Sequence, residues 1–451
     1  MSETELLDNI NHSFDIFSLI SNVYLFLQSK PYNEIRKSYF NKIADEKYFD
    51  EFKGIDELIN TISLMDGFDF SSLIEIWIDE FTNSKLDSIM FCYHFLLKID
   101  TIINDFKGEN EVGPLNKNEN CYFYYKNNNF YYSKAFADAG IRKGRQTTKY
   151  DKNSINFYLE NFQIINIENL NKYRPIIKKF KFKYKFGSSL KIGIVPLSRE
   201  KWFNVVEDKK SKTFYVEYDS SKLEKHNNQI KDILIDLDKS GTNIAIFPEL
   251  AMNKETEKYI QSFVNHSNFN NLKLIFLGSF WDNNKKRNEA ILISAKGSIL
   301  LRAEKKLPYS EYNKDDEQYY DEDICINNDI FFIDIDGLGR ISYLICADFN
   351  EEIINNICSV MNVDFCFVSA FSNSTELMFN TAYGNAKSKA ISTVLCNSCA
   401  AYKNEKDNLD SFIVALNTKK KRIIAKSHKF GISSYCGKCD HCLHTAEIEP
   451  K

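Results

Sequence analysis

Hydrophobic residues recur at different spacings in two parts of this chain. From residue 5 to about 107 they repeat every three or four positions, as in LLDNINHSFDIFSLISNVYLFLQS, which is the period of an amphipathic helix. From residue 190 onward, short apolar runs such as KIGIVPL, NIAIFPEL and ISYLICAD alternate with helical patterns near 219–239, 253–265 and 350–360. Strands that alternate with helices are typical of an α/β domain. We therefore expect a helical region followed by an α/β domain that uses both faces of its sheets.

The segment between these two parts has a third pattern. From Lys179 to Phe186, lysine alternates strictly with phenylalanine or tyrosine. A period of two predicts a strand with one buried and one solvated face. Lysines on the solvated face favour an edge strand that is protected from pairing with other sheets. Basic residues interleaved with aromatic ones over 121–186 could instead bind a nucleic-acid strand, and we favour the edge strand.

The charge balance changes at the same places as the hydrophobic pattern. Residues 1–110 carry 20 acidic and 9 basic side chains, a net charge of −11, whereas residues 111–190 carry 6 acidic and 15 basic ones, a net charge of +9. These shifts predict four segments: an acidic α-helical domain at 1–110, a basic and aromatic-rich linker or small domain at 111–189, the α/β domain at 190–425, and a Cys/His-rich tail at 426–451. The acidic domain is a candidate surface for a protein partner.

Composition narrows the class of protein. With 43% hydrophobic and 27% charged residues the chain has the composition of a globular protein, and its formal net charge of −4 gives no general attraction to nucleic acid or membranes. No apolar run approaches the ~20 residues that a spanning helix needs, and the first residues do not resemble a signal peptide. The 11 cysteines are an odd number scattered over a long chain, which favours a reducing compartment. We expect a cytoplasmic protein without a membrane partner.

Three of the predicted strands end in residues with reactive side chains. Glu249 ends NIAIFPEL, Lys305 and Lys306 follow SILLRAE, and Cys346 ends ISYLIC. A carboxylate can take the proton of the thiol, the thiolate can attack a carbonyl or nitrile carbon, and an ammonium can stabilise the oxyanion. The three residues together therefore suit acyl transfer, although a single cysteine in an apolar run is more often a core residue.

The order and context of these residues resemble the nitrilase (carbon–nitrogen hydrolase) superfamily over residues 190–425. The pattern FPEL contains Glu249, and the pattern C-x-D with further acidic residues nearby contains Cys346 and Asp348. Asn288, Ala290 and Gly297 match the N-x-A pattern and the glycine that stands eight places before the lysine of the family. The resemblance implies a four-layer α-β-β-α sandwich, preceded here by the helical domain, with a Glu–Lys–Cys triad.

The resemblance also implies roles for further residues. The eight-residue spacing from Gly297 favours Lys305 as the catalytic lysine. Lys306 stays in reserve, because the K-x-x-L pattern of the family places a leucine three residues after the lysine and Leu307 comes only two residues after Lys305. A second glutamate supports the base in this family, and Glu311 is our candidate, with Glu317 as the alternative. The backbone N–H of Ala347 would donate to the oxyanion. Members of the family act mostly on small amides, some act on nitriles, and they usually dimerise, so we expect a homo-oligomer that needs no cofactor for catalysis.

The tail contains a separate candidate site. In SSYCGKCDHCLH, two C-x-x-C steps share their middle cysteine, and such spacing can hold one face of a tetrahedral zinc ion with histidine as the fourth ligand. The candidate ligands are Cys436, Cys439, Cys442, His441 and His444. The alternative is a reduced tail without metal.

Two functional hypotheses follow from the sequence. The first is a thiol-dependent hydrolase of amidase type that forms a thioester on Cys346, regulated by or coupled to its N-terminal region. The second is a nitrilase-like scaffold or sensor subunit of a multi-component system, which could be linked to nucleic acid or to defence. The presence of all three triad residue types favours the enzyme.

Overall fold

A computed structural model of the chain describes residues 1–13, 15–31, 52–63, 70–102, 116–117, 121–125, 159, 162–170, 172–180, 190–197, 200–335, 337–401, 410–417, 422–429 and 444–448. The described residues up to Leu170 form one compact unit, and those from Lys172 onward form a second. Each unit is described here by itself. None of the helices in these ranges is long and apolar enough to cross a membrane.

The first unit is a small bundle of helices with its own core, as the hydrophobic spacing predicts. The helices are α1 (Glu3–Asn11), α2 (Ile16–Gln28), α4 (Lys53–Ser63), α5 (Phe70–Asn83) and α6 (Ser88–Ile102). Capping boxes begin α1 at Ser2 and α2 at Asp15, which satisfies backbone N–H groups that a helix start leaves unpaired. Trp77 is fully buried and packs against Phe91 and Phe95 of α6. The expected helical N-terminal region is confirmed.

An antiparallel sheet completes the first unit. Its strands are β1 (Asn116–Lys117), β2 (Cys121–Tyr125) and β3 (Phe162–Asn166), in that order, and the turn η5 (Ile167–Leu170) follows. Cys121 and Ile164 are buried in the same core as the helices. The unit is therefore not purely helical.

The second unit is built on two large sheets. The six-stranded sheet has the order β11-β10-β9-β8-β5-β20 and the seven-stranded sheet has the order β19-β18-β17-β16-β15-β14-β4. The strands of the first are β5 (Leu190–Ile194), β8 (Ile244–Ile246), β9 (Leu274–Asp282), β10 (Arg287–Ser294), β11 (Ile299–Glu304) and β20 (His444–Ile448). The strands of the second are β4 (Arg174–Phe180), β14 (Asp329–Ile335), β15 (Gly339–Ile345), β16 (Phe365–Ala370), β17 (Ser392–Asn397), β18 (Asp410–Asn417) and β19 (Arg422–Lys429).

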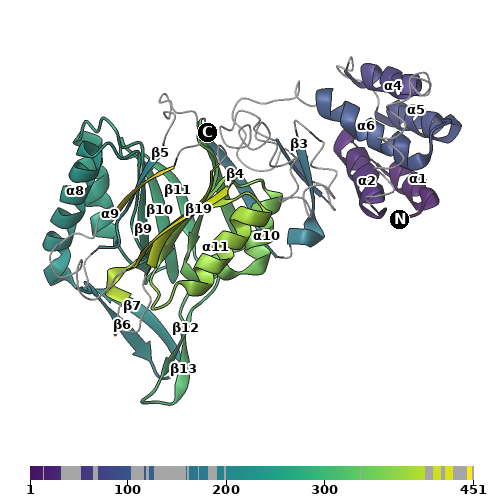
Figure 1. Cartoon of the computed structure of the whole chain (residues 1–451). Coiled ribbons are helices and arrows are strands. Elements are labelled where there is room, and N and C mark those ends of the chain that lie inside the picture. Colours follow the sequence, from purple (N-terminus) through teal and green to yellow (C-terminus); the bar gives the residue numbers. More distant parts are fainter. Residues whose placement is uncertain are drawn as a thin grey trace. The chain divides into compact units, whose positions relative to one another are not determined.

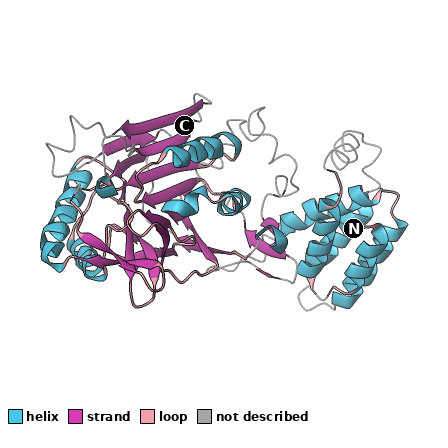
Figure 2. Cartoon of the chain, turned by 90° about the horizontal axis from the view of Figure 1, so that it is seen from below, coloured by secondary structure: helices cyan, strands magenta, loops and turns pink. Residues whose placement is uncertain are grey.

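The two sheets pack face to face and helices cover their outer faces. Phe276 of β9 stacks on Phe367 of β16 with ring centroids 4.0 Å apart, so the inner faces are in direct contact. The covering helices are α8 (Leu223–Lys239) and α9 (Lys254–His266) on one side and α10 (Glu352–Val360) and α11 (Glu376–Ser388) on the other, with the short turns η6 (Ser220–Lys222), η7 (Cys346–Asn350) and η8 (Cys399–Ala401) between elements. Figure 2 shows the strands between these helices. The predicted four-layer α-β-β-α sandwich is confirmed.

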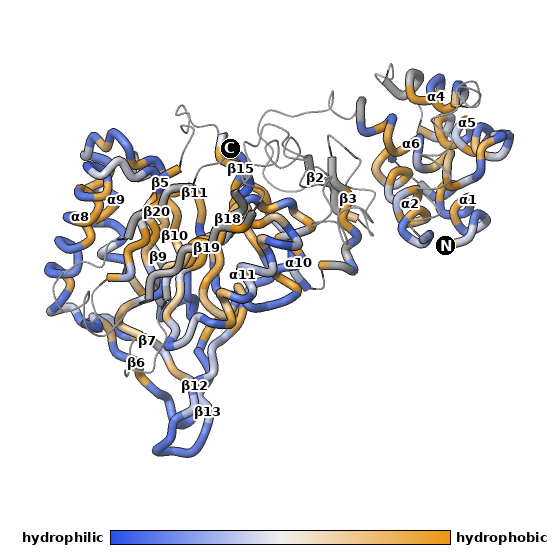
Figure 3. The backbone as a smooth tube through the Cα atoms, viewed as in Figure 1, coloured by the Kyte–Doolittle hydropathy of each residue, from blue (hydrophilic) through white to orange (hydrophobic). Residues whose placement is uncertain are grey.

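A smaller four-stranded sheet projects from the sandwich. It has the order β12-β13-β7-β6, with bounds β6 (Phe203–Asp208), β7 (Thr213–Tyr218), β12 (Ser310–Asn313) and β13 (Gln318–Glu322). Figure 3 shows a hydrophilic β12–β13 hairpin beside the apolar strands of the sandwich. Only the base of this sheet contributes to the site described below.

The sandwich also takes in strands from outside the predicted segment 190–425. β4 pairs in parallel with β14 and is the last strand of its sheet, so Lys178 and Lys179 lie on an edge strand. β20 pairs antiparallel with β5 at the edge of the other sheet. The remainder of the alternating Lys/Phe pattern, residues 181–186, lies outside the described residues.

Candidate active site

Glu249 stands at the sharp turn that follows β8. The next residue, Leu250, has φ of +59°, a conformation that is uncommon for residues with a side chain. Gly278 of β9 lies against this turn, because a Cβ at Gly278 would be 2.0 Å from the carbonyl oxygen of Pro248. Trp202 donates its indole N–H to the carbonyl oxygen of Leu250 at 3.0 Å. The local structure thus fixes the direction in which the Glu249 side chain points.

The carboxylate of Glu249 is buried and accepts several hydrogen bonds. Its Oε1 atom accepts from Lys305 Nζ at 2.9 Å and from Asn288 Nδ2 at 2.9 Å, and its Oε2 atom accepts from the backbone N–H of Phe371 at 3.0 Å. Burial raises the pKa of Glu249, and Glu322 adds to the rise although Lys305 opposes it. A carboxylate with a raised pKa is a stronger base than an exposed one, which suits proton abstraction.

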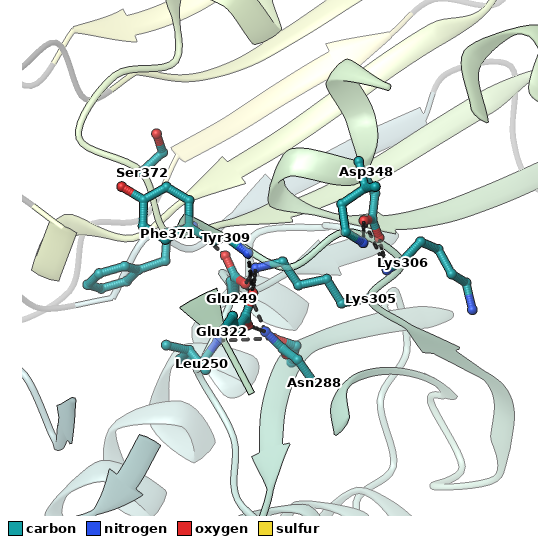
Figure 4. Close-up of polar contacts among 12 residues, drawn as sticks. Glu249, Leu250, Asn288, Lys305, Lys306, Tyr309, Glu322, Asp348, Phe371 and Ser372 are labelled. Carbon is teal, nitrogen blue, oxygen red and sulfur yellow. Dashed lines mark hydrogen bonds and ion pairs between the residues drawn. The ribbon is translucent and has the colours of Figure 1, made fainter. Parts of the chain in front are cut away.

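Lys305 lies between two carboxylates. Its ammonium nitrogen is 2.9 Å from Glu249 Oε1 and 2.7 Å from Glu322 Oε2, and all three side chains are buried (Figure 4). Burial alone would lower the pKa of Lys305, but Glu249, Glu322 and Cys346 outweigh it, and the pKa is well above its usual value. The side chain therefore carries a positive charge throughout the neutral pH range.

Lys306, the neighbouring lysine, turns away from this cluster. Its ammonium donates to Asn327 Oδ1 at 2.7 Å, and Figure 4 shows it pointing away from Glu249. Its backbone N–H instead donates to Asp348, at 3.0 Å and 3.1 Å to the two carboxylate oxygens, and the N–H of Leu307 donates to Asp348 at 2.9 Å. The structure thus places Lys305, the lysine that the spacing favours, next to Glu249. The side chain of Asp348 connects the backbone at Lys306 and Leu307 to η7.

Cys346 is the first residue of the turn η7, directly after β15. It has φ of +47° and is 6% exposed. Its thiol lies close enough to Glu249 and Lys305 for both charges to shift its pKa. Burial raises the pKa of the Cys346 thiol, Glu249 raises it further, and Lys305 lowers it. The resting cysteine is therefore a thiol rather than a thiolate, and it needs a base to become a nucleophile.

The second carboxylate at this site belongs to Glu322 rather than Glu311. Glu311 lies on the edge strand β12, opposite Tyr320, and Glu317 is exposed in the turn of the hairpin. Glu322 ends β13, where it contacts Lys305 and accepts the N–H of Tyr309 at 3.0 Å. Burial alternates along β13, with Tyr320 and Glu322 buried, so a period-two reading of QYYDE could have marked Glu322 as inward-facing but not as a partner of Lys305.

The remaining predicted residues are placed as follows. Ala347 is half-buried in η7, directly after the thiol. Of the candidate zinc ligands, Cys436, Cys439, His441 and Cys442 lie outside the described residues, and His444 begins β20 without a described side chain. Elsewhere in the described ranges, no group of three or more Cys, His, Asp or Glu side chains is arranged to hold a metal ion. The sequence analysis missed Phe371, whose backbone N–H donates to Glu249.

Comparison with known proteins finds likeness in structure only. No family model matches this sequence, and no curated protein matches it either. Solved structures that match include Saccharomyces cerevisiae Nit3, a member of branch 10 of the nitrilase superfamily (14% identity, 59% of this chain and 93% of that chain, TM-score 0.38). An amidase from Nesterenkonia sp. matches with 12% identity over 59% of this chain and 93% of that chain, with a TM-score of 0.40. A glutamine-dependent NAD+ synthetase from Acinetobacter baumannii matches over 58% of this chain and 45% of its own, with 14% identity and a TM-score of 0.41. Structures of nitrilase-superfamily members are thus among those that match, with identities of 14% or less and TM-scores of 0.41 or below.

Proposed function

We propose that this protein is a thiol-dependent hydrolase that cleaves the non-peptide carbon–nitrogen bond of a small amide. The observation that supports the proposal is the buried cluster in which Glu249 pairs with the Lys305 ammonium at 2.9 Å and both charges lie near the Cys346 thiol. A base, a nucleophile and a cation close to one another are the groups that acyl transfer needs.

The reaction would proceed in two steps. In the first, Glu249 takes the thiol proton, the sulfur of Cys346 attacks the carbonyl carbon, and the negative charge on the oxygen is stabilised by Lys305 and the N–H of Ala347. Collapse of this intermediate breaks the carbon–nitrogen bond, Glu249 returns the proton to the leaving amine, and a thioester remains on Cys346. In the second step Glu249 deprotonates a water molecule, which attacks the thioester and releases the acid and the free thiol.

The thioester is the species to look for. Full-length protein would be mixed with a panel of small amides, quenched in acid and examined by intact-mass and peptide mass spectrometry. We expect a mass increase equal to the acyl group on Cys346. Cys325, an exposed cysteine, provides a matched control: Cys325→Ala should keep the adduct and Cys346→Ala should lose it.

The same experiment separates the enzyme from the scaffold or sensor. An adduct that persists in Cys346→Ala would contradict the proposed nucleophile. The absence of any adduct and of any released amine across the panel would favour a scaffold or sensor. Nitriles belong in the panel as a second substrate class, because thiol attack on a nitrile carbon uses the same three groups.

A further inference from the structure

Asn288 on β10 connects the lysine to both carboxylates of the cluster. Its backbone carbonyl oxygen accepts the N–H of Lys305 at 2.9 Å. Its side-chain Nδ2 donates to Glu249 Oε1 at 2.9 Å and to Glu322 Oε1 at 3.2 Å (Figure 4). The residue is 1% exposed, so these bonds form away from bulk solvent. One residue thus contacts both of the anions and the main chain of the cation.

The orientation of the Asn288 amide is set by the two glutamates. Its carbonyl oxygen, Oδ1, is buried and has no hydrogen-bond partner among the described residues. Turning the amide by 180° would place that oxygen against two carboxylate oxygens, which is repulsive unless one of them carries a proton. The present orientation therefore favours the ionised form of Glu249, since a hydrogen bond donated to a carboxylate stabilises its charge.

We propose that Asn288 is a positioning residue that keeps Glu249 ionised, and so able to accept the thiol proton, at neutral pH. The inference rests on the proposed function. Burial opposes ionisation of a carboxylate, and the N–H that Asn288 donates to Glu249 counteracts it. Glu322 holds the other side of the same amide and of the Lys305 ammonium.

Several titratable groups lie around Glu249 and Glu322. Lys305 follows β11, Glu322 ends β13, Cys346 follows β15, and Tyr218 of β7 lies close enough for Glu249 to raise its pKa. Asp348 faces Lys305 from η7. None of these contacts is altered directly when the Asn288 side chain is shortened.

The test measures thiol reactivity and requires no substrate. The rate at which iodoacetamide alkylates Cys346 in the full-length protein would be followed against pH by peptide mass spectrometry. Since the sulfur reacts when Glu249 accepts its proton, the rate should rise as Glu249 ionises. In Asn288→Ala this rise should move upward by about 0.5–1 pH unit because a donor to the ionised form is lost. Alkylation of the exposed Cys325 in the same samples controls for the intrinsic reactivity of iodoacetamide.

Two further variants serve as a control and as an alternative to Asn288→Ala. Asn243 bonds backbone groups of Lys191 and Asn271 rather than any of the reactive side chains, so Asn243→Ala should leave the pH of the rise unchanged. Asn288→Asp keeps the shape of the side chain while replacing the donor, and it should also move the rise upward. If Asn288→Ala does not fold, Asn288→Asp decides the question.

An unchanged pH profile in a folded Asn288 variant would overturn the inference, as would a wild-type Cys346 that iodoacetamide does not modify at any pH. Failure of the proposed function gives a different result. In that case the alkylation profile still shifts in Asn288→Ala, but no amide or nitrile leaves an acyl group on Cys346.

Discussion

Two groups of buried charges in the sandwich contain similar side chains and differ in the groups that they combine. Arg340 on β15 pairs with Asp334 on β14 through two hydrogen bonds of 2.7 Å and 3.0 Å, and its third nitrogen donates to the carbonyl oxygen of Met361 at 2.6 Å. The guanidinium there pairs with the Asp334 carboxylate, while the backbone N–H of Arg340 donates to a second buried carboxylate, Asp364, at 2.9 Å. At the candidate active site, one ammonium pairs with two carboxylates near a thiol. The first group is a guanidinium–carboxylate pair, whereas the second combines a base, a cation and a nucleophile, and only the second is suited to chemistry.

The largest expected effect is the loss of turnover when the thiol is removed. Cys346→Ala should abolish hydrolysis of any substrate found for the wild type, because no other group at the site can form the thioester. The fold should persist, since the change removes one sulfur atom. Turnover by product analysis and folding by circular dichroism are the measurements. Wild-type turnover in a folded Cys346→Ala protein would show that the chemistry lies elsewhere.

Breaking the Arg340–Asp334 pair should affect stability rather than catalysis. Arg340→Met leaves Asp334 buried without its partner, and we expect the free energy of unfolding to fall by about 3–5 kcal/mol. Urea denaturation would measure the change. The double variant Arg340→Met/Asp334→Leu should recover most of it, because replacing both charges removes the unpaired ion. A double variant as unstable as the single one would mean that the loss comes from packing.

Removing the base at the candidate active site should affect catalysis rather than stability. Glu249→Gln should lower kcat on the order of 10²-fold or more while the protein stays folded, because proton transfer is lost in both steps. Glu257, a buried glutamate that pairs with Arg302 outside the site, supplies the matched variant. Glu257→Gln should leave kcat per folded molecule near the wild-type value, and equal losses in both variants would contradict a specific role for Glu249.

Asp348 should make the stability of the folded protein depend on pH. Burial raises the pKa of Asp348 from 3.8 to about 7. Between these values the unfolded chain has released the proton while the folded protein still holds it, so stability falls as pH rises from about 4 to 7 and is then constant. Asp348→Asn removes this contribution. Relative to the variant, the wild type should lose on the order of 2 kcal/mol between about pH 5 and pH 8, as measured by urea denaturation at both values. A constant difference would contradict the raised pKa.

The smallest expected effect distinguishes the two neighbouring lysines. Lys306→Met should change kcat by less than about tenfold, because its ammonium bonds Asn327 rather than the reactive groups. Lys305→Met should lower kcat by at least about a hundredfold through the loss of charge next to the oxyanion. Steady-state kinetics of the two variants side by side would check this, and the reverse order would assign the catalytic role to Lys306.

The sequence predicted those features that depend on local pattern. Strand-end positions singled out Glu249, Lys305 and Cys346, which lie near one another in the structure. The hydrophobic spacing predicted the helical region and an α/β domain, whereas the four-layer sandwich was implied by the resemblance to the nitrilase superfamily. The sequence did not predict Glu322, because that residue comes from a hairpin of a third sheet whose approach to β11 depends on tertiary packing. The contribution of Phe371 is a backbone N–H, which carries no residue-specific signal. β20 was missed since it pairs with β5, a strand some 250 residues earlier in the chain.

The glycine at 278 has a consequence for how inactive relatives of this chain would arise. A methyl group there would meet the carbonyl oxygen of Pro248, so Gly278→Ala would displace the turn that carries Glu249. Such a protein would retain every residue with a reactive side chain and still lack an aligned base. Descendants that have lost the chemistry can therefore look intact when only their triad is inspected, and the residue that faces Pro248 is a more sensitive marker of whether the site is assembled.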